Sequence, residues 1–391
     1  MTKRLVLEQA DRLHYVPPEI DDFLPRRKGT SLLGLDILDL ARFSWPIQAE
    51  APAPEKVDDG ARSDETARLA EETAVWYRSR FGVRLNPAKE IFIGESIRQT
   101  LSLLSLAFFN PGDVVLIPDP GVWHYRAAIA MASAETIPYH LRERTHFKPT
   151  LSTMSLNLAR LIKGMILNIP HNPTGAVLSR EELAELVHWA ARANLPLILD
   201  QAFCGLVEGS SPVSLFAVPG GKKVGLELYS YAYNFGRPQP APAFAVGQPT
   251  LISELKRIAA VFRGAPGDQQ VRSALASLAD PDTGLDHLRT RYSRNREALD
   301  RLCQRLRLAT PEYRSGPFYW ARLPGRKQSR RFCRRLYLKC GLLAVPGTAF
   351  GEGGEGFIRF SLTADPALYD KALEITGQLF QATRRARRRN G

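Results

Sequence analysis

Short, almost uninterrupted apolar runs alternate with segments of helical periodicity over much of the chain. The runs are four or five residues long, which is typical of strands buried on both faces. The segments between them place apolar residues three and four positions apart, as amphipathic helices do. The pattern predicts a mostly parallel sheet covered by helices, with strands at 90–93, 113–117, 164–168, 197–200 and 226–230, and helices at 65–81, 97–109, 123–132 and 180–193.

The alternation changes near residue 286. A long Arg-rich helix is expected there, followed by short strands and two further helices, which indicates a smaller α+β unit. We therefore expect an α/β protein with three parts. These are an N-terminal arm with part of the small domain (1–48), a large domain (49–285) and a C-terminal small domain with a basic tail (286–391).

Composition fits a folded protein and gives little sign of metal chemistry. The chain has 391 residues, of which 44% are hydrophobic, 24% are charged and only four are cysteines. No Cys pair or His cluster has metal-ligand spacing, so no metal site is expected. The start of the chain has no apolar signal segment, and the apolar stretch 101–109 is too short to span a bilayer. These features favour a cytoplasmic protein that does not bind membranes.

Net charge raises the question of nucleic-acid binding. The chain carries +13 charges, partly in the arginines of 384–389, a run that usually frays into solvent as a tail. No helix-turn-helix, zinc-finger or RNA-recognition pattern accompanies this charge, so no nucleic-acid partner is expected.

A series of motifs follows the expected strands in a fixed order. The most informative are His171-Asn172-Pro173-Thr174-Gly175, Leu197-Ile198-Leu199-Asp200, Gly316-Pro317-Phe318-Tyr319-Trp320, Val345-Pro346-Gly347-Thr348 and Phe357-Ile358-Arg359. The ordered set resembles the class I/II aminotransferases, the fold-type I pyridoxal-phosphate enzymes. Together with Asp11-Arg12-Leu13 it looks most like the LL-diaminopimelate and alanine aminotransferase branch. The resemblance implies a homodimer with sites between subunits, and says more about fold than about activity.

Three residues match the functional positions of that family. Asp200 corresponds to the Asp that keeps the cofactor's pyridine nitrogen protonated. Asn172 corresponds to the Asn that hydrogen-bonds the ring oxygen, and Arg359 to the Arg that binds the substrate carboxylate.

Other family positions hold different residues. A gap-free comparison from Glu227 to Gly247 puts Tyr233 where the Schiff-base lysine belongs, with Ala232 and Ala241 at the neighbouring serine and the phosphate arginine. A Tyr cannot form that covalent bond.

Departures continue around the expected cofactor ring and phosphate. Phe203 replaces the tyrosine that hydrogen-bonds the ring, and Val122 the stacking aromatic, although Trp123 is adjacent. The phosphate turn contains Glu95, whose charge would oppose a phosphate dianion. Bulky Phe43 falls in the segment that would border the substrate.

The departures lead to one functional expectation and two alternatives. We expect a repurposed enzyme that works without pyridoxal phosphate on a carboxylate-bearing small molecule, in the manner of amino-acid-derived specialised metabolism. Asp200, Tyr233 and His124 would be its acid/base residues, Arg359 and Asn172 would bind substrate, and Asn172, Asp200 and Trp123 would be remnants of the cofactor pocket.

The first alternative is a non-catalytic pseudoenzyme that acts as a binding partner. The second is an enzyme that uses pyridoxal phosphate or pyridoxamine phosphate without a Schiff base to a lysine at 233, or with a relocated lysine. Asp200 itself has two interpretations that stay equally open, a raised-pKa acid/base group or a buried carboxylate satisfied by another neighbour.

Overall fold

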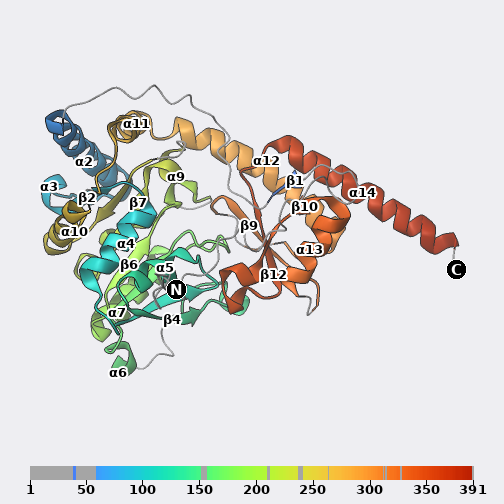
Figure 1. Cartoon of the computed structure of the whole chain (residues 1–391), viewed down its shortest axis with the longest axis horizontal. Coiled ribbons are helices and arrows are strands. Elements are labelled where there is room, and N and C mark those ends of the chain that lie inside the picture. The colour runs from blue at the N-terminus through green and yellow to red at the C-terminus, as the bar shows by residue number, and fades with distance from the viewer. Residues whose placement is uncertain are drawn as a thin grey trace, which may run out of the picture.

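The chain is built around a large sheet and a smaller group of strands (Figure 1). The structure, a computed structural model, describes residues 38–40, 59–150, 156–208, 212–236, 241–262, 264–310, 312, 315–325 and 328–389. Phe43, most of the N-terminal arm 1–48 and residues 49–58 lie outside these residues. The proposed domain boundaries stay a prediction.

The large sheet has seven strands in the order β2-β8-β7-β6-β5-β3-β4. Strand β8 runs antiparallel to both of its neighbours, whereas the other pairs are parallel. The expected mostly parallel sheet is thereby confirmed. The strands are β2 (Ile91–Gly94), β3 (Val114–Asp119), β4 (Glu135–His140), β5 (Gly164–Asn168), β6 (Leu197–Asp200), β7 (Gly225–Ser230) and β8 (Ala243–Val246).

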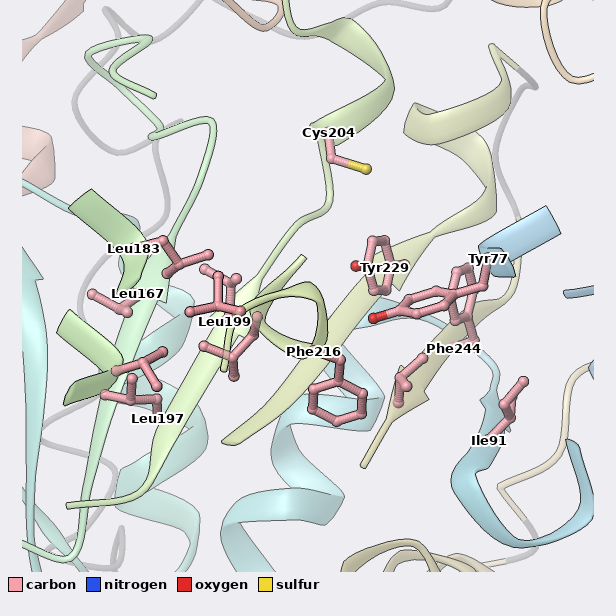
Figure 2. Close-up of a cluster of buried hydrophobic side chains, with 14 of the residues drawn as sticks. Tyr77, Ile91, Leu167, Leu183, Leu197, Leu199, Cys204, Phe216, Tyr229 and Phe244 are labelled. Carbon is pink, nitrogen blue, oxygen red and sulfur yellow. The ribbon is translucent and has the colours of Figure 1, made fainter. Parts of the chain in front are cut away.

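Helices cover both faces of this sheet, because successive strand residues point to opposite sides. Leu167 and Leu199 belong to one buried cluster, which Figure 2 shows together with Tyr77, Tyr229 and Phe244. Ile166 and Ile198 belong to the cluster on the other side. The helices are α2 (Asp59–Phe81), α3 (Pro87–Glu90), α4 (Ile97–Phe108), α5 (His124–Met131), α6 (Leu156–Ala159), α7 (Arg180–Ala193), α8 (Gly221–Val224), α9 (Tyr231–Phe235), α10 (Pro249–Val261) and α11 (Asp268–Ala279).

The C-terminal part forms the smaller α+β unit that was expected. Strands β11 (Val345–Pro346), β12 (Phe357–Ser361) and β9 (Phe318–Arg322) form an antiparallel sheet in that order. Strand β1 (Leu38–Asp39) pairs in parallel with β10 (Leu342–Leu343). Helices α12 (Thr283–Leu306), α13 (Ser329–Cys340) and α14 (Pro366–Arg389) complete the unit, whose own buried cluster includes Leu299, Leu336 and Phe360.

Two sequence expectations differ from the structure. Strand β4 was not predicted, because it is the edge strand of the sheet and four of its six residues are exposed, so it carries no apolar run. The expected frayed tail is also wrong for the backbone, which stays helical to Arg389.

Two further sequence expectations concern membranes and metals. Among the described residues, no helix is both long and apolar enough to cross a membrane. In the same part of the chain, no group of three or more His, Cys, Asp or Glu side chains is arranged to hold a metal ion.

Candidate active site

The candidate site begins where two neighbouring parallel strands end. Asn168 ends β5, Asp200 ends β6, and the two residues lie opposite each other in the strand register. The Asn168 side-chain amide donates to the backbone carbonyl of Asp200, with a nitrogen–oxygen distance of 3.2 Å. The carboxyl ends of parallel strands commonly carry binding sites in open α/β sheets, so this edge is the natural place for one.

The Asp200 carboxylate is buried, with 3% of the residue exposed. The Tyr125 hydroxyl donates to its Oδ2 at 2.6 Å, and the backbone N–H of Ala202 donates to its Oδ1 at 2.9 Å. Burial raises the pKa of Asp200, and these two hydrogen bonds offset part of the rise. No ion pair of Asp200 with another described residue is present, so its charge has neutral partners only.

Sequence reasoning missed Tyr125. It lies in the first turn of α5, the helix that follows β3, and β3 is the strand beside β5. The signal was its place just after the carboxyl end of a neighbouring strand, which is where side chains can reach Asp200.

Asn172 and Arg359 connect the large sheet to the small one. Arg359, on β12, donates from Nη1 to Oδ1 of Asn172 at 3.1 Å. The backbone N–H of Asn172 in turn donates to Oδ1 of Asn168 at 2.8 Å. A continuous set of hydrogen bonds therefore runs from Asp200 through Asn168 and Asn172 to Arg359.

The Arg359 guanidinium is enclosed by aromatic rings. Its Cζ lies 3.9 Å from the centroid of Phe318 and 4.8 Å from that of Phe350. Such stacking favours a cation whose planar edge faces a carboxylate. Only 3% of the residue is exposed, and burial lowers the pKa of Arg359 to about 9, so it is still largely cationic at neutral pH.

A glycine-containing turn holds Phe350 in this position. The backbone N–H of Gly353 donates to both carboxylate oxygens of Asp119, at 2.9 and 3.1 Å. The N–H of Gly121 donates to the Phe350 carbonyl at 2.7 Å. A Cβ at Gly351, whose φ is +111°, would come within 2.2 Å of an Asp119 oxygen, so the close approach depends on glycine. The end of β3 thus fixes the turn that covers Arg359.

Tyr233 lies in α9, directly after β7, where the resemblance places the lysine. Its ring centroid is 4.8 Å from that of Phe203, and Phe203 lies 5.8 Å from Phe318. Tyr233 also packs against the buried cluster of the small unit. The structure therefore links Tyr233 to the Arg359 environment through aromatic contacts.

Trp123 and His124 lie at the start of α5, and Arg98 stands over Trp123, with Cζ 5.3 Å from the ring centroid. The Nε2 atom of His124 is buried and has no hydrogen-bond partner among the described residues. Burial, reinforced by the positive charge of Arg98, lowers the pKa of His124 to about 3. His124 is therefore neutral at physiological pH, and its lowered pKa makes it a weak base. The roles of these residues stay predictions.

The turn before α4 forms a local cap. The Gln99 side chain accepts from the backbone N–H of Glu95 and donates to its carboxylate, both at 2.9 Å. Ser96 caps the helix by accepting from the Gln99 N–H at 3.2 Å. The exposed Glu95 carboxylate is therefore engaged within its own turn.

The geometry agrees with the result of comparison with known families. Residues 54–375 match the model of the family described as aminotransferase class I and II. Because the match covers most of the chain, the protein belongs to this family.

Several individual relatives and solved structures are similar over most of the chain. The LL-diaminopimelate aminotransferases of Halothermothrix orenii and Aquifex aeolicus are 28% and 29% identical, over 94% and 92% of this chain and 97% and 95% of their own. A probable N-succinyldiaminopimelate aminotransferase from Thermus thermophilus has a similar structure, with a TM-score of 0.80 at 27% identity, and covers 88% of this chain and 95% of its own. Substrate-bound BacF from Bacillus subtilis has a TM-score of 0.77 at 26% identity, over 88% and 90% of the two chains.

Family membership overturns one expectation, the absence of a cofactor. Aminotransferases of this class depend on pyridoxal phosphate, and the relatives named as aminotransferases match almost the whole chain. The expectation was wrong because it gave the covalent and phosphate anchors too much weight.

The described residues fit the pyridine ring. A buried carboxylate without a cationic partner, Asp200, suits a protonated ring nitrogen. Asn172 uses its Oδ1 for Arg359, while its Nδ2 makes no hydrogen bond with another described residue and so can donate to a ring oxygen.

Proposed function

We propose that this protein binds pyridoxal phosphate or pyridoxamine phosphate without a covalent bond at position 233, where Tyr233 replaces the lysine, and that it acts on a small amino or 2-oxo acid. One observation carries the proposal, the hydrogen-bonded path from Asp200 through Asn168 and Asn172 to Arg359. The path begins at the backbone carbonyl of Asp200, so it connects the strand end that carries the Asp200 carboxylate, a group suited to the ring nitrogen, with Arg359, a group suited to a substrate carboxylate.

Each residue of that path has a separate task. When bound, the cofactor supplies an electron-withdrawing pyridine ring. Asp200 holds the proton on the ring nitrogen, and Tyr125 keeps the carboxylate oriented. Asn172 donates to the ring oxygen while it also orients Arg359, which binds the substrate carboxylate through its guanidinium edge.

Tyr233 has a different part in the proposal. Its phenol can hydrogen-bond or exchange a proton, but it cannot bind the cofactor covalently. In the proposal, the proton that a lysine would carry moves instead between the substrate and Tyr233 or His124. We keep both as candidate acid/base residues. The homodimer expected from the resemblance also remains part of the proposal.

A titration of the purified protein with pyridoxal 5′-phosphate tests this function. Visible absorption measures binding, and borohydride reduction followed by intact-mass analysis detects a covalent adduct. We expect saturable binding without an adduct in the wild type, and a stoichiometric adduct in Tyr233→Lys. An adduct on a wild-type lysine would show a relocated lysine instead, and no saturable binding of either cofactor form would overturn the proposal.

A second candidate function is that of a non-catalytic binding partner. The packing of Tyr233 against Phe203 favours it, because this contact occupies the place of two cofactor-binding groups. Amine transfer from LL-diaminopimelate or other amino acids to a 2-oxo acid distinguishes the candidates. Cofactor binding without turnover of any amino acid tested would favour the binding partner.

A further inference from the structure

The positive charge of the protein is concentrated in its C-terminal part. From residue 286 onward the sequence has 23 Lys and Arg against nine Asp and Glu, a net charge of +14. The 285 residues before it have 30 and 31, a net charge of −1. The excess charge is therefore a property of one unit and not of the whole surface.

Helix α13 presents much of this charge to solvent. It contains five basic residues and no acidic one. Arg331, Arg334, Arg335 and Lys339 are all exposed, and none of the four makes an ion pair or side-chain hydrogen bond with another described residue. Charges gathered in this way repel one another, and their repulsion is relieved when an anionic partner binds.

Other basic segments extend the same end of the molecule. Figure 1 shows α13 and α14 on the side of the small unit away from the large sheet, with α14 reaching past α13. The last part of α14, from residue 375 on, has five Arg and no acidic residue in the sequence. Arg305 of α12 donates to the carbonyl of Leu373, which anchors α14 to the unit.

We propose that the exposed face of α13, defined by Arg331, Arg334, Arg335 and Lys339, is a docking surface for an acidic protein. The inference does not depend on the proposed function, because these residues lie outside the candidate site. Arginine pairs with carboxylates through two parallel hydrogen bonds, which suits a surface rich in Asp and Glu.

Apolar side chains on the same helix favour an acidic protein as the partner over a membrane or a nucleic acid. Leu338 is 38% exposed beside the basic residues, and Tyr337 is half-buried. Protein interfaces combine Arg with aromatic and apolar contacts in this way. A membrane is less suited, because the apolar side of the helix, with Cys333, Leu336 and Cys340, is already buried in the unit. A nucleic acid is disfavoured because no helix-turn-helix, zinc-finger or RNA-recognition pattern accompanies this charge in the sequence.

Binding of a poly-L-glutamate probe to the full-length protein at low salt tests the proposal. The main variant carries Arg331→Glu, Arg334→Glu and Arg335→Glu. A matched control places the same charge change on exposed arginines of the large sheet's helices and loops, Arg126→Glu, Arg144→Glu and Arg192→Glu. We expect the α13 variant to bind at least about tenfold more weakly than wild type, and the control to change affinity by less than about twofold.

Two parallel probes decide the class of partner. A DNA duplex of 24 base pairs and phosphatidylserine vesicles are titrated under the same conditions. Tighter binding of either probe than of polyglutamate, with the same dependence on the three arginines, would overturn the assignment to an acidic protein. An equal loss in both charge variants would show an effect of net charge alone and would overturn the docking surface.

Discussion

Two buried carboxylates on adjacent strands, Asp200 on β6 and Glu227 on β7, have very different surroundings. Glu227 accepts from the hydroxyls of Tyr77 and Tyr229, from the Gln201 side-chain amide and from the backbone N–H of Leu215. Its partners Tyr77 and Tyr229 belong to the buried cluster of Figure 2, where both are labelled. Asp200 has two donors and lies at a strand end, beside the path that leads to Arg359.

Burial raises the pKa of both carboxyl groups, so the pKa direction does not separate them. The two carboxylates differ instead in the number and origin of their hydrogen-bond donors. The donors to Glu227 all come from the core around it, as expected of a structural group, whereas Asp200 accepts from two neutral donors and has no cationic partner among the described residues. A shifted pKa alone therefore does not mark a functional site, because the surroundings of the group must also suit a ligand.

The largest effect is expected from Glu227→Ala. Removing the carboxylate leaves several buried donors unsatisfied and opens a cavity, which should cost about 4 kcal/mol of unfolding free energy. Urea denaturation followed by circular dichroism measures the loss. Glu227→Gln is the matched control, because it keeps the shape and one acceptor oxygen, while the hydroxyls of Tyr77 and Tyr229 can accept from its amide N–H, so it should lose less than half as much. A loss below 1 kcal/mol in the alanine variant would contradict the structural role.

Asp200→Asn should affect cofactor binding more than stability, the reverse of what is expected for Glu227. We expect its affinity for pyridoxal phosphate to fall about 100-fold, because the charge opposite the ring nitrogen is lost. Absorption titration measures this affinity, with Glu227→Gln expected to stay within about threefold of wild type. Equal losses in the two variants would remove the distinction between the carboxylates.

The pH dependence of unfolding sharpens the same contrast. The raised pKa of folded Asp200 means that its stabilising effect is complete below the unfolded pKa near 4, and is lost as pH rises through the folded pKa. Asn cannot ionise, so the stability of Asp200→Asn relative to wild type should increase with pH above about 4. Urea midpoints at a series of pH values give this difference, and a difference that decreases with pH would contradict the assignment.

Sequence reasoning found the strands that carry the site but not all of its contacts. The bounds of β5, β6 and α7 matched the structure, because each has an uninterrupted apolar or amphipathic pattern. Asp200, Asn172 and Arg359 were proposed from their motifs, and the structure connects them by hydrogen bonds, Asp200 through its backbone carbonyl. Tyr125 and Asn168 were missed, because their contacts join residues that are 75 and 32 positions from Asp200. Only the folded sheet brings such residues together.

Arg359→Lys tests the substrate half of the site. Lysine keeps the charge but loses the planar fork, so we expect the affinity for a 2-oxo acid to fall about tenfold. Cofactor affinity should change by less than about threefold, because Asp200, the residue proposed to face the ring nitrogen, is untouched. Isothermal titration calorimetry of the cofactor-loaded protein measures the affinity for the 2-oxo acid. If cofactor affinity fell as much as acid affinity, Arg359 would be acting on the ring and not on the carboxylate.

The smallest effect is expected from Tyr125→Phe, which deletes one hydroxyl beside Asp200. The Tyr125 hydrogen bond lowers the pKa of Asp200, so its loss raises that pKa further and makes the carboxylate harder to ionise. Pyridoxal-phosphate affinity near pH 7 should fall about threefold, equivalent to about 0.7 kcal/mol. The lower pH limit of binding should move upward. Absorption titrations between pH 5 and about 8 measure both changes.

Tyr139→Phe is the control, because the Tyr139 hydroxyl donates to the Ile166 carbonyl and not to Asp200, so it should leave the pH limit in place. An unchanged limit in Tyr125→Phe would mean that the ionisation of Asp200 does not govern binding, and the contrast with Glu227 would then rest on location alone.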